Sequence, residues 1–337
     1  MTPMLSQLKN LKLDPLIGLI ITAVILAVLF PARGQFAHYF SIATNIGIGL
    51  LFFLYGARLS PSEALAGLKH WRLHLTILAF TFVFFPVLGL LLKPMEYATS
   101  HELYLGILYL CLVPSTVQSS VAFTSIARGN IAGAIVSASA SNLIGVIATP
   151  ILVMLLMSSG TGVQVDSSVF INIATQLLLP FALGQLLRKW VGDFAAKKGT
   201  KIVDRGSIAM VVYSAFSAGM VQGIWSRVSF LDLVTLTVLS IAMVAFMLWF
   251  TKFVAERLRF DRPDVIAIEF CGTKKSLATG LPMAAVIFGG AKVGILILPL
   301  MIFHQVQLMM CATLASRYAQ QGPARSRGVG PTAQPSH

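Results

Sequence analysis

The sequence predicts an all-α polytopic membrane protein with ten transmembrane helices, and three observations support this fold class. First, 56% of its 337 residues are hydrophobic and only 11% are charged, whereas a soluble domain carries about 25% charged residues. Second, the hydrophobic residues form continuous runs, unlike the alternating segments of about ten residues typical of an outer-membrane barrel. Third, loops that contain several Lys and Arg residues alternate along the chain with loops that contain few.

The hydrophobic runs define ten predicted spans separated by polar loops. Asp14 and Pro15 open the first span, and no small-residue cleavage site follows it, so we expect an uncleaved helix and not a signal peptide. The spans cover about 14–30, 40–55, 73–92, 104–126, 131–157, 169–187, 208–224, 231–254, 262–288 and 293–315.

The loop charges predict the orientation of these spans. If the N-terminus is cytoplasmic, 19 of the 25 Lys and Arg residues lie in cytoplasmic segments and 4 lie on the opposite side. This distribution follows the positive-inside rule and predicts a multi-pass inner-membrane protein with both termini in the cytoplasm. The net charge of +13 is therefore a topology signal, and we expect no nucleic-acid partner.

The chain divides into two halves of five spans each. The predicted segments are a cytoplasmic N-terminus (1–13), a first five-helix repeat (14–157), a connecting loop (158–168), a second repeat (169–318) and a disordered cytoplasmic tail (319–337). Because each half has an odd number of spans, the second half starts on the opposite side of the membrane and is inverted relative to the first. The fourth span of each half is interrupted by polar residues, and such paired interruptions are typical of transporter binding sites.

The interruption in the ninth span places charge deep in the membrane. Asp261 is a plausible N-cap, Pro263 is expected at the first helical position, and the helix is expected to break at 271–273. At 1.5 Å per residue this break lies roughly 13–15 Å from the helix start, which is about half the hydrocarbon thickness. Glu269, Lys274 and Lys275 would then lie near the midplane, where ionisable residues usually have a function.

The roles of these three residues are left open. Glu269 could bind a cation or carry a proton, or it could be a structural carboxylate tied to a neighbouring helix. Either lysine could take the place of a bound sodium ion, couple transport to protons, hold an anionic substrate, or simply neutralise Glu269.

Other polar residues form clusters within the spans. The fourth span is predicted to break across 114–120, and its hydroxyls and amide oxygen suit sodium, although Ser and Thr also serve helix packing. Asn142 in the fifth span and His304 in the tenth could line a cavity or make interhelical contacts. These clusters contain Ser115, Thr116, Gln118, Ser119, Ser120, Thr124, Ser125, Ser137, Ser141, Asn142, His304, Gln305 and Gln307.

Several enzyme classes are excluded by missing motifs. The three cysteines show no paired spacing, so we expect no disulfide framework and no metal site. No HExxH motif, dinucleotide fingerprint or P-loop is present, so neither a metalloprotease, a dehydrogenase nor an ATP-driven pump is expected. We therefore expect no enzyme and no cofactor other than a sodium ion.

The chain resembles the bile acid:sodium symporter family over about 14–318. The resemblance rests on the run Pro114…Ser119-Ser120…Ala127-Arg128-Gly129-Asn130 and on 268–278, with sequence Ile-Glu-Phe-Cys-Gly-Thr-Lys-Lys-Ser-Leu-Ala. Within the family, the runs 270–277 and 301–308 look most similar to the bacterial relatives of solute carrier family 10 member 7.

The resemblance implies a fold and a sodium site. Spans 1, 2, 6 and 7 would form a panel, and the remaining spans would form a core in which the broken spans 4 and 9 cross. Ser119 or Ser120, Ser137 or Ser141, and Glu269 would carry over to the family's first sodium site. Lys274-Lys275 stands where the family's second site has a polar Gln-Asn-type pair. A fixed ammonium would repel sodium there by about 4 kcal/mol at 4 Å, so we expect that second site to be lost and replaced by a lysine.

These observations predict a secondary active transporter that moves a small organic anion across the lipid bilayer by alternating access. Coupling to one sodium ion or to protons is left open. A membrane regulator or scaffold without transport is the alternative. The candidates for substrate binding or coupling are Gln118, Asn142, Thr273, Lys274, Lys275, His304 and Gln305.

Overall fold

The computed structural model describes residues 15–58, 70–157, 171–289 and 292–321. The predicted N-terminus (1–13), the connecting loop (158–168) and the part of the predicted tail from residue 322 lie outside these described residues. Within the described residues the secondary structure is helical and contains no strand, which confirms the all-α prediction.

The first part of the chain forms a series of helices of very different lengths. They are α2 (Pro15–Leu29), α3 (Gly34–Arg58), α5 (Trp71–Ala79), η2 (Phe80–Phe84), α6 (Phe85–Leu91), η3 (Lys93–Tyr97), α7 (His101–Leu112), α8 (Gln118–Ile126) and α9 (Ile131–Met157). The segment η2 is a π-helical turn that joins α5 and α6 into one continuous helix.

The second part repeats this mixture of long and interrupted helices. Its elements are η4 (Ala174–Leu178), α11 (Leu179–Leu186), α12 (Arg188–Ala195), η5 (Lys198–Thr200), α13 (Lys201–Val221), η6 (Ile224–Arg227), α14 (Phe230–Arg257), α15 (Arg262–Thr273), α16 (Leu277–Phe288) and α17 (Val293–Gln320).

Helix length and surface composition identify a membrane protein. Among the described residues, five helices are long and apolar enough to cross a membrane: Gly34–Arg58, Trp71–Leu91, Ile131–Met157, Phe230–Arg257 and Val293–Gln320. Large apolar side chains such as Leu29, Ile46 and Leu155 are more than half exposed on helix surfaces. Such surfaces suit lipid contact and would be costly in water.

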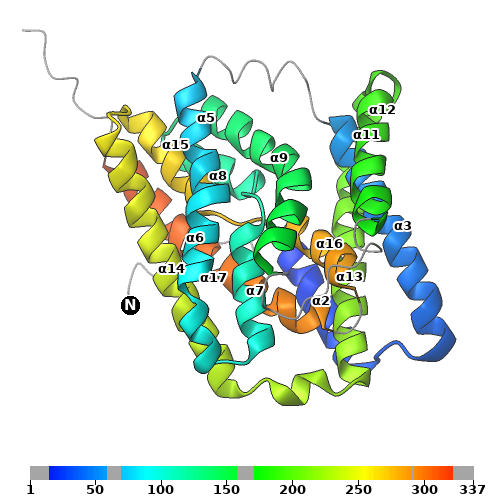
Figure 1. The fold of residues 1–337 in the computed structure, drawn as a ribbon. Coiled ribbons are helices and arrows are strands. Elements are labelled where there is room, and N and C mark those ends of the chain that lie inside the picture. The colour runs from blue at the N-terminus through cyan, green and yellow to red at the C-terminus, as the bar shows by residue number, and fades with distance from the viewer. Residues whose placement is uncertain (1–14, 59–69, 158–170, 290–291, 322–337) are drawn as a thin grey trace, which may run out of the picture.

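The helices fall into two groups (Figure 1). The panel consists of α2, α3, α11, α12 and α13, in which α3 packs against α11 and α13, and α2 packs against α13. The core consists of α5–α9 and α14–α17, in which α14 packs against α15 and α17, and α7 packs against α17. Helix α13 also contacts α16 and α17, and η4, which leads into α11, contacts α9 and α16, so both elements meet the core.

Glycines allow α3 and α11 of the panel to approach closely. A Cβ atom added at Gly56 would collide with the backbone carbonyl of Phe181, and one added at Gly184 would collide with the backbone carbonyl of Phe53. Small residues at helix interfaces let backbones approach in this way in membranes.

The ninth-span helix breaks later than predicted. Asp261 is the N-cap, as expected, and its Oδ1 accepts a hydrogen bond from the Asp264 N–H at 3.2 Å. Pro263, however, is the second helical residue, and α15 continues through Gly272 to Thr273 before an extended segment at 274–276. The prediction of a break at 271–273 is therefore wrong.

Packing explains why Gly272 lies inside the helix. A Cβ atom at this position would lie 3.2 Å from Cγ2 of Thr251 and 3.3 Å from Cβ of Phe80. The glycine therefore permits a close approach to α14 and η2, and the extended segment contains both lysines. The fourth-span break is likewise shorter than predicted, because it covers 113–117 and α8 already begins at Gln118.

The helix ends also differ from the predicted span ends. Helix α3 begins at Gly34 instead of 40, α13 begins at Lys201 instead of 208, and α17 runs to Gln320, into the predicted tail. The short helix α12 was not predicted. Hydrophobic runs mark only the apolar centre of a span, whereas helices extend into the interfacial layers, where polar residues are tolerated.

Candidate functional site

The two broken helices of the core are hydrogen-bonded to each other at their breaks. The Ser276 N–H donates to the Pro114 carbonyl at 2.8 Å, and the Ser115 hydroxyl donates to the Cys271 carbonyl at 2.6 Å. Breaks in membrane helices expose backbone groups that need partners. Here each break provides hydrogen-bond donors for carbonyl groups at the other break.

Lys275 satisfies three further carbonyls around the same point. Its Nζ donates to the carbonyls of Thr81 at 2.9 Å, Cys111 at 2.9 Å and Val113 at 2.8 Å. The side chain is fully buried, and its Nζ also lies 4.2 Å from the centre of the Phe85 ring. The Lys275 side chain, which comes from the break between α15 and α16, therefore contacts both the continuous helix α5–α6 and the C-terminal end of α7.

The freed carbonyls follow from the local sequence. In the π-helical turn the Phe85 N–H bonds to the Phe80 carbonyl, five residues back. The next donor in that register would serve Thr81, but it is Pro86, which has no N–H. Likewise, the Ser115 N–H, which would serve Cys111 in a continuous α-helix, donates instead to Oγ of Ser141 at 3.0 Å.

Lys274, the neighbouring residue, has different surroundings. It is also fully buried, but its Nζ has no hydrogen-bond partner among the described residues. It lies 3.9 Å from the centre of the Phe123 ring and 5.5 Å from that of Phe270. Two hydroxyls of α8, those of Ser119 and Thr124, are likewise buried without a partner among the described residues.

Glu269 is held by a tyrosine and not by either lysine. Its side chain is 2% exposed, and the Tyr318 hydroxyl donates to Oε2 at 2.9 Å and to Oε1 at 3.2 Å. Lys252 Nζ in turn donates to the Tyr318 oxygen at 3.3 Å. No ion pair joins Glu269 to Lys274 or Lys275 within the described residues, so neutralisation of Glu269 by one of these lysines is not observed.

The predicted sodium ligands contact several different partners. Ser120 donates to the Phe270 carbonyl at 3.4 Å, next to Glu269. Oγ of Ser137 lies 2.6 Å from Nδ1 of His74, and Ser141 accepts from the Ser115 N–H. No contact within the described residues joins the serines to Glu269 directly, and the sodium site stays a prediction.

Asn142 connects the two breaks on the side that faces the panel. Its Nδ2 donates to the Ser115 carbonyl at 2.7 Å, and its Oδ1 accepts from the Thr279 hydroxyl at 2.7 Å. Thr279 also donates its N–H to Oγ of Ser276, the N-cap of α16, at 3.2 Å.

A cavity of about 350 Å³ lies between the panel and this part of the core. Gln118, Asn142 and Thr279 line it from the core, while α3 and α13 of the panel line it with Tyr55 and with charged residues. The charged residues on the cavity wall are Arg58, Lys201, Asp204 and Arg205.

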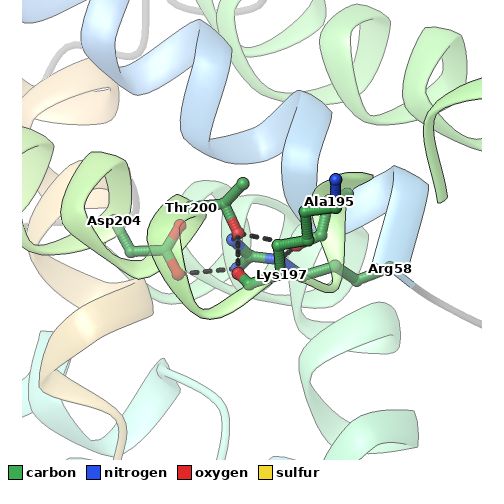
Figure 2. A network of polar contacts seen from close by, with 5 residues as sticks. All are labelled: Arg58, Ala195, Lys197, Thr200 and Asp204. Atoms are coloured by element: carbon green, nitrogen blue, oxygen red, sulfur yellow. Dashed lines mark hydrogen bonds and ion pairs between the residues drawn. The ribbon is translucent and has the colours of Figure 1, made fainter. Parts of the chain in front are cut away.

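One of these arginines is already neutralised (Figure 2). Arg58 forms an ion pair with Asp204 at 2.6 Å and also donates to the Ala195 carbonyl and to the Thr200 hydroxyl. Lys201 and Arg205 make no hydrogen bond or ion pair within the described residues. The cavity wall therefore carries two cations that are available to a ligand.

The remaining predicted residues are distributed around the breaks. The Thr273 hydroxyl lies 3.3 Å from that of Thr251, and Nδ1 of His304 lies 2.8 Å from Nε2 of Gln307. Gln305 follows His304 on α17 and is partly buried. Of the predicted residues, Thr116, Gln118 and Asn142 line the cavity and the others do not.

Sequence reasoning missed several residues of this region: His74, Thr81, Lys201, Arg205, Lys252, Thr279 and Tyr318. Most lie at span ends or have side chains common in membrane helices, so the sequence pattern did not mark them as site residues. Tyr318 and Lys252 could have been found by asking which groups near the cytoplasmic span ends can reach Glu269.

Two broken helices that meet beside a cavity at a helix-group interface define a class of membrane transport proteins. The comparison with known families agrees: residues 14–320 match the SBF-like CPA transporter family. The chain belongs to this family and is a multi-pass transmembrane transporter rather than an enzyme.

Three relatives place the chain more closely. It is 53% identical to "Uncharacterized protein PA2026" of Pseudomonas aeruginosa, over 90% of this chain and 92% of the relative. It is 48% identical to "Putative symporter YfeH" of Escherichia coli strain K12, over 92% and 94% of the two chains. It is 29% identical to "Sodium/bile acid cotransporter 7" of Rattus norvegicus, over 84% and 85%.

Proposed function

We propose that this protein is a secondary active transporter that moves a small organic anion across the inner membrane by alternating access between panel and core. The observation that carries the proposal is the cavity bounded on one side by α3 and α13 and on the other by both broken helices. A substrate held there contacts both groups, so relative movement of the groups would expose it to alternate sides.

The charge of the cavity wall supports an anionic substrate. Lys201 and Arg205 carry two positive charges without a partner among the described residues, while Arg58 and Asp204 neutralise each other. Gln118 and Asn142 add amide groups on the core side. A carboxylate or sulfonate bound between them would be paired with charge and hydrogen-bonded.

The topology proposed here is that of two inverted five-helix repeats with both termini in the cytoplasm. The interrupted pairs α7/α8 and α15/α16 support it, because they occupy corresponding positions in the two halves of the chain. The proposed orientation places Arg58, Lys201 and Arg205, and hence the cavity, toward the cytoplasmic side.

Coupling to sodium or protons forms the second part of the proposal. The proposed sodium ligands are Ser119 or Ser120, Ser137 or Ser141, and Glu269. Relatives named as a symporter and as a sodium/bile acid cotransporter support ion coupling. Glu269 offers a buried carboxylate for either ion, and a lysine at the break could carry a proton instead.

Sodium coupling is tested by the thermal stability of the purified protein in detergent, with sodium titrated against choline at several pH values. A ligand that binds the folded state raises its apparent stability. We expect stabilisation by sodium that Glu269→Gln abolishes and that Tyr97→Phe, a change at an exposed position, preserves. A response to pH that Glu269→Gln removes, with none to sodium, would indicate proton coupling.

Anion transport is tested by uptake into proteoliposomes, with taurocholate and succinate as probes. Arg205→Gln and Lys201→Gln are expected to raise KM at least about tenfold if each supplies one charge-assisted bond. Arg72→Gln is the control, since Arg72 is exposed and does not line this cavity. Equal uptake by wild type, both variants and empty liposomes would count against these anions.

A regulator or scaffold without transport is the alternative. Such a protein would keep its cellular role when Glu269 is replaced by Gln. Complementation of a deletion strain by Glu269→Gln at wild-type level would therefore favour the alternative.

A further inference from the structure

We infer that the carbonyl oxygens of Thr81, Cys111 and Val113 form a site for a monovalent cation, which the ammonium group of Lys275 fills as a tethered ion. Shortening the side chain should open this site to a free cation. The inference rests on the carbonyl geometry and does not depend on the proposed transport of an anion.

The ligand set is what a desolvated monovalent cation requires. Three backbone oxygens lie 2.8–2.9 Å from Nζ. The Thr81 carbonyl lacks a π-helical donor because residue 86, five positions on, is a proline, and the Cys111 and Val113 carbonyls lie at the C-terminal end of α7, where the helix stops. Rings of backbone carbonyls replace the hydration shell of potassium in selective channels. A larger cation such as potassium or ammonium should fit this spacing better than sodium.

The electrostatic surroundings also favour a cation. Cys111 and Val113 lie at the C-terminal end of α7, where the helix dipole concentrates negative partial charge. The face of the Phe85 ring lies 4.2 Å from Nζ and adds a cation–π contact. No carboxylate forms an ion pair with Lys275 in the described part of the chain, so neutral dipoles hold the charge.

A second feature fixes the ammonium in this place. Gln307 binds the backbone of Lys275 on both sides, through Oε1 to its N–H at 2.9 Å and through Nε2 to its carbonyl at 2.8 Å. The neighbouring Lys274 has the same burial but no hydrogen-bond partner within the described residues. It therefore provides a matched control one residue away.

The experiment compares Lys275→Ala, Lys275→Met and Lys274→Ala with the wild type, each purified in potassium chloride and in choline chloride. Melting temperatures are then measured at constant ionic strength with choline, sodium, potassium or ammonium. We expect potassium and ammonium to stabilise Lys275→Ala saturably, by about 5 °C at 100 times Kd. Wild type and Lys274→Ala should show no such response.

The Lys275→Met variant separates charge from packing. Methionine fills most of the space without supplying a cation, so this variant should be less stable than wild type and should not respond to potassium or ammonium. Binding of radioactive rubidium gives a direct readout, with about one ion per chain expected for Lys275→Ala and none for wild type.

The proposal is overturned by any of three results. They are cation-independent stability of Lys275→Ala, a Lys275→Met variant as stable as the wild type, and failure of Lys275→Ala to fold in potassium as well as in choline. Recovery of folded Lys275→Ala in potassium alone would support it. A sodium response of the wild type that depends on Glu269 concerns the proposed function and leaves this inference unaffected.

Discussion

The side chain of Asn142 accepts a hydrogen bond from the Thr279 hydroxyl at 2.7 Å, and this contact links the fifth span to the start of α16. The same asparagine donates to the Ser115 carbonyl in the first break. One amide group thus contacts both breaks and also faces the cavity, where a bound substrate would meet it.

Removing this link is expected to impair both stability and transport. Thr279→Val deletes the donor and leaves Oδ1 of Asn142 without it, which should cost about 1–3 kcal/mol. Thr279→Ser should retain most of the stability. Thr237→Val is the matched control, because Thr237 is exposed and bonds only within its own helix. Equal melting temperatures for the two valine variants would contradict the prediction.

The contact between Tyr318 and Glu269 predicts a second effect. Tyr318→Phe removes both hydrogen bonds to a buried carboxylate, and bonds to charged groups are worth about 1.5–3 kcal/mol. We expect a lower melting temperature and altered ion affinity, measured by the sodium and pH titrations described above. Tyr97→Phe, at a 95% exposed position, should leave both unchanged. An unaltered ion response in Tyr318→Phe would show that the tyrosine has only a structural role.

The position of the ninth-span break is tested at Gly272. Gly272→Ala should destabilise the protein by about 1–3 kcal/mol, because the added methyl meets Thr251 and Phe80. Gly18→Ala is the control: nothing lies within 4 Å of a Cβ there, so the gain of up to about 1 kcal/mol in helix propensity should remain. Chemical or thermal unfolding measures both. Stabilisation by Gly272→Ala would mean that α14 and η2 do not pack closely on α15.

The network around Arg58 predicts that lysine cannot replace it (Figure 2). The guanidinium group bonds Asp204, Thr200 and the Ala195 carbonyl at once, in a fork that a single ammonium cannot reproduce. Arg58→Lys should therefore lower stability by about 1–2 kcal/mol. Arg72→Lys should have a smaller effect, since Arg72 is exposed and makes one hydrogen bond, to the Leu258 carbonyl, beside a cation–π contact with Phe260 that an ammonium can also make. Similar losses in both variants would argue against a role for the fork geometry.

The fold class could be read from the sequence because membrane burial depends on the composition of each segment. The fifth span, 131–157, was predicted with the bounds that α9 has in the structure. Both interrupted helices were found by their polar residues. Their breaks were misplaced by a few residues, because Gly272 looked like a helix breaker and is instead a packing residue.

The candidate site was predictable only in part. Buried acid and lysines gave a strong signal, because few such residues occur inside membrane spans. The partners of these residues could not be predicted, because they are distant in the sequence. Tyr318 lies 49 residues from Glu269, and Thr81 lies 194 residues from Lys275. The predicted sodium ligands stay a prediction.

By itself the sequence determined that the chain is helical, lies in a membrane and has two interrupted spans, since these follow from hydrophobicity summed along continuous segments. Only the tertiary structure decided that Lys275 is held by three carbonyls while the adjacent Lys274 has no hydrogen-bond partner among the described residues. The physical reason is that a hydrogen bond requires two groups within about 3 Å. That distance depends on which helices meet, and no local pattern records it.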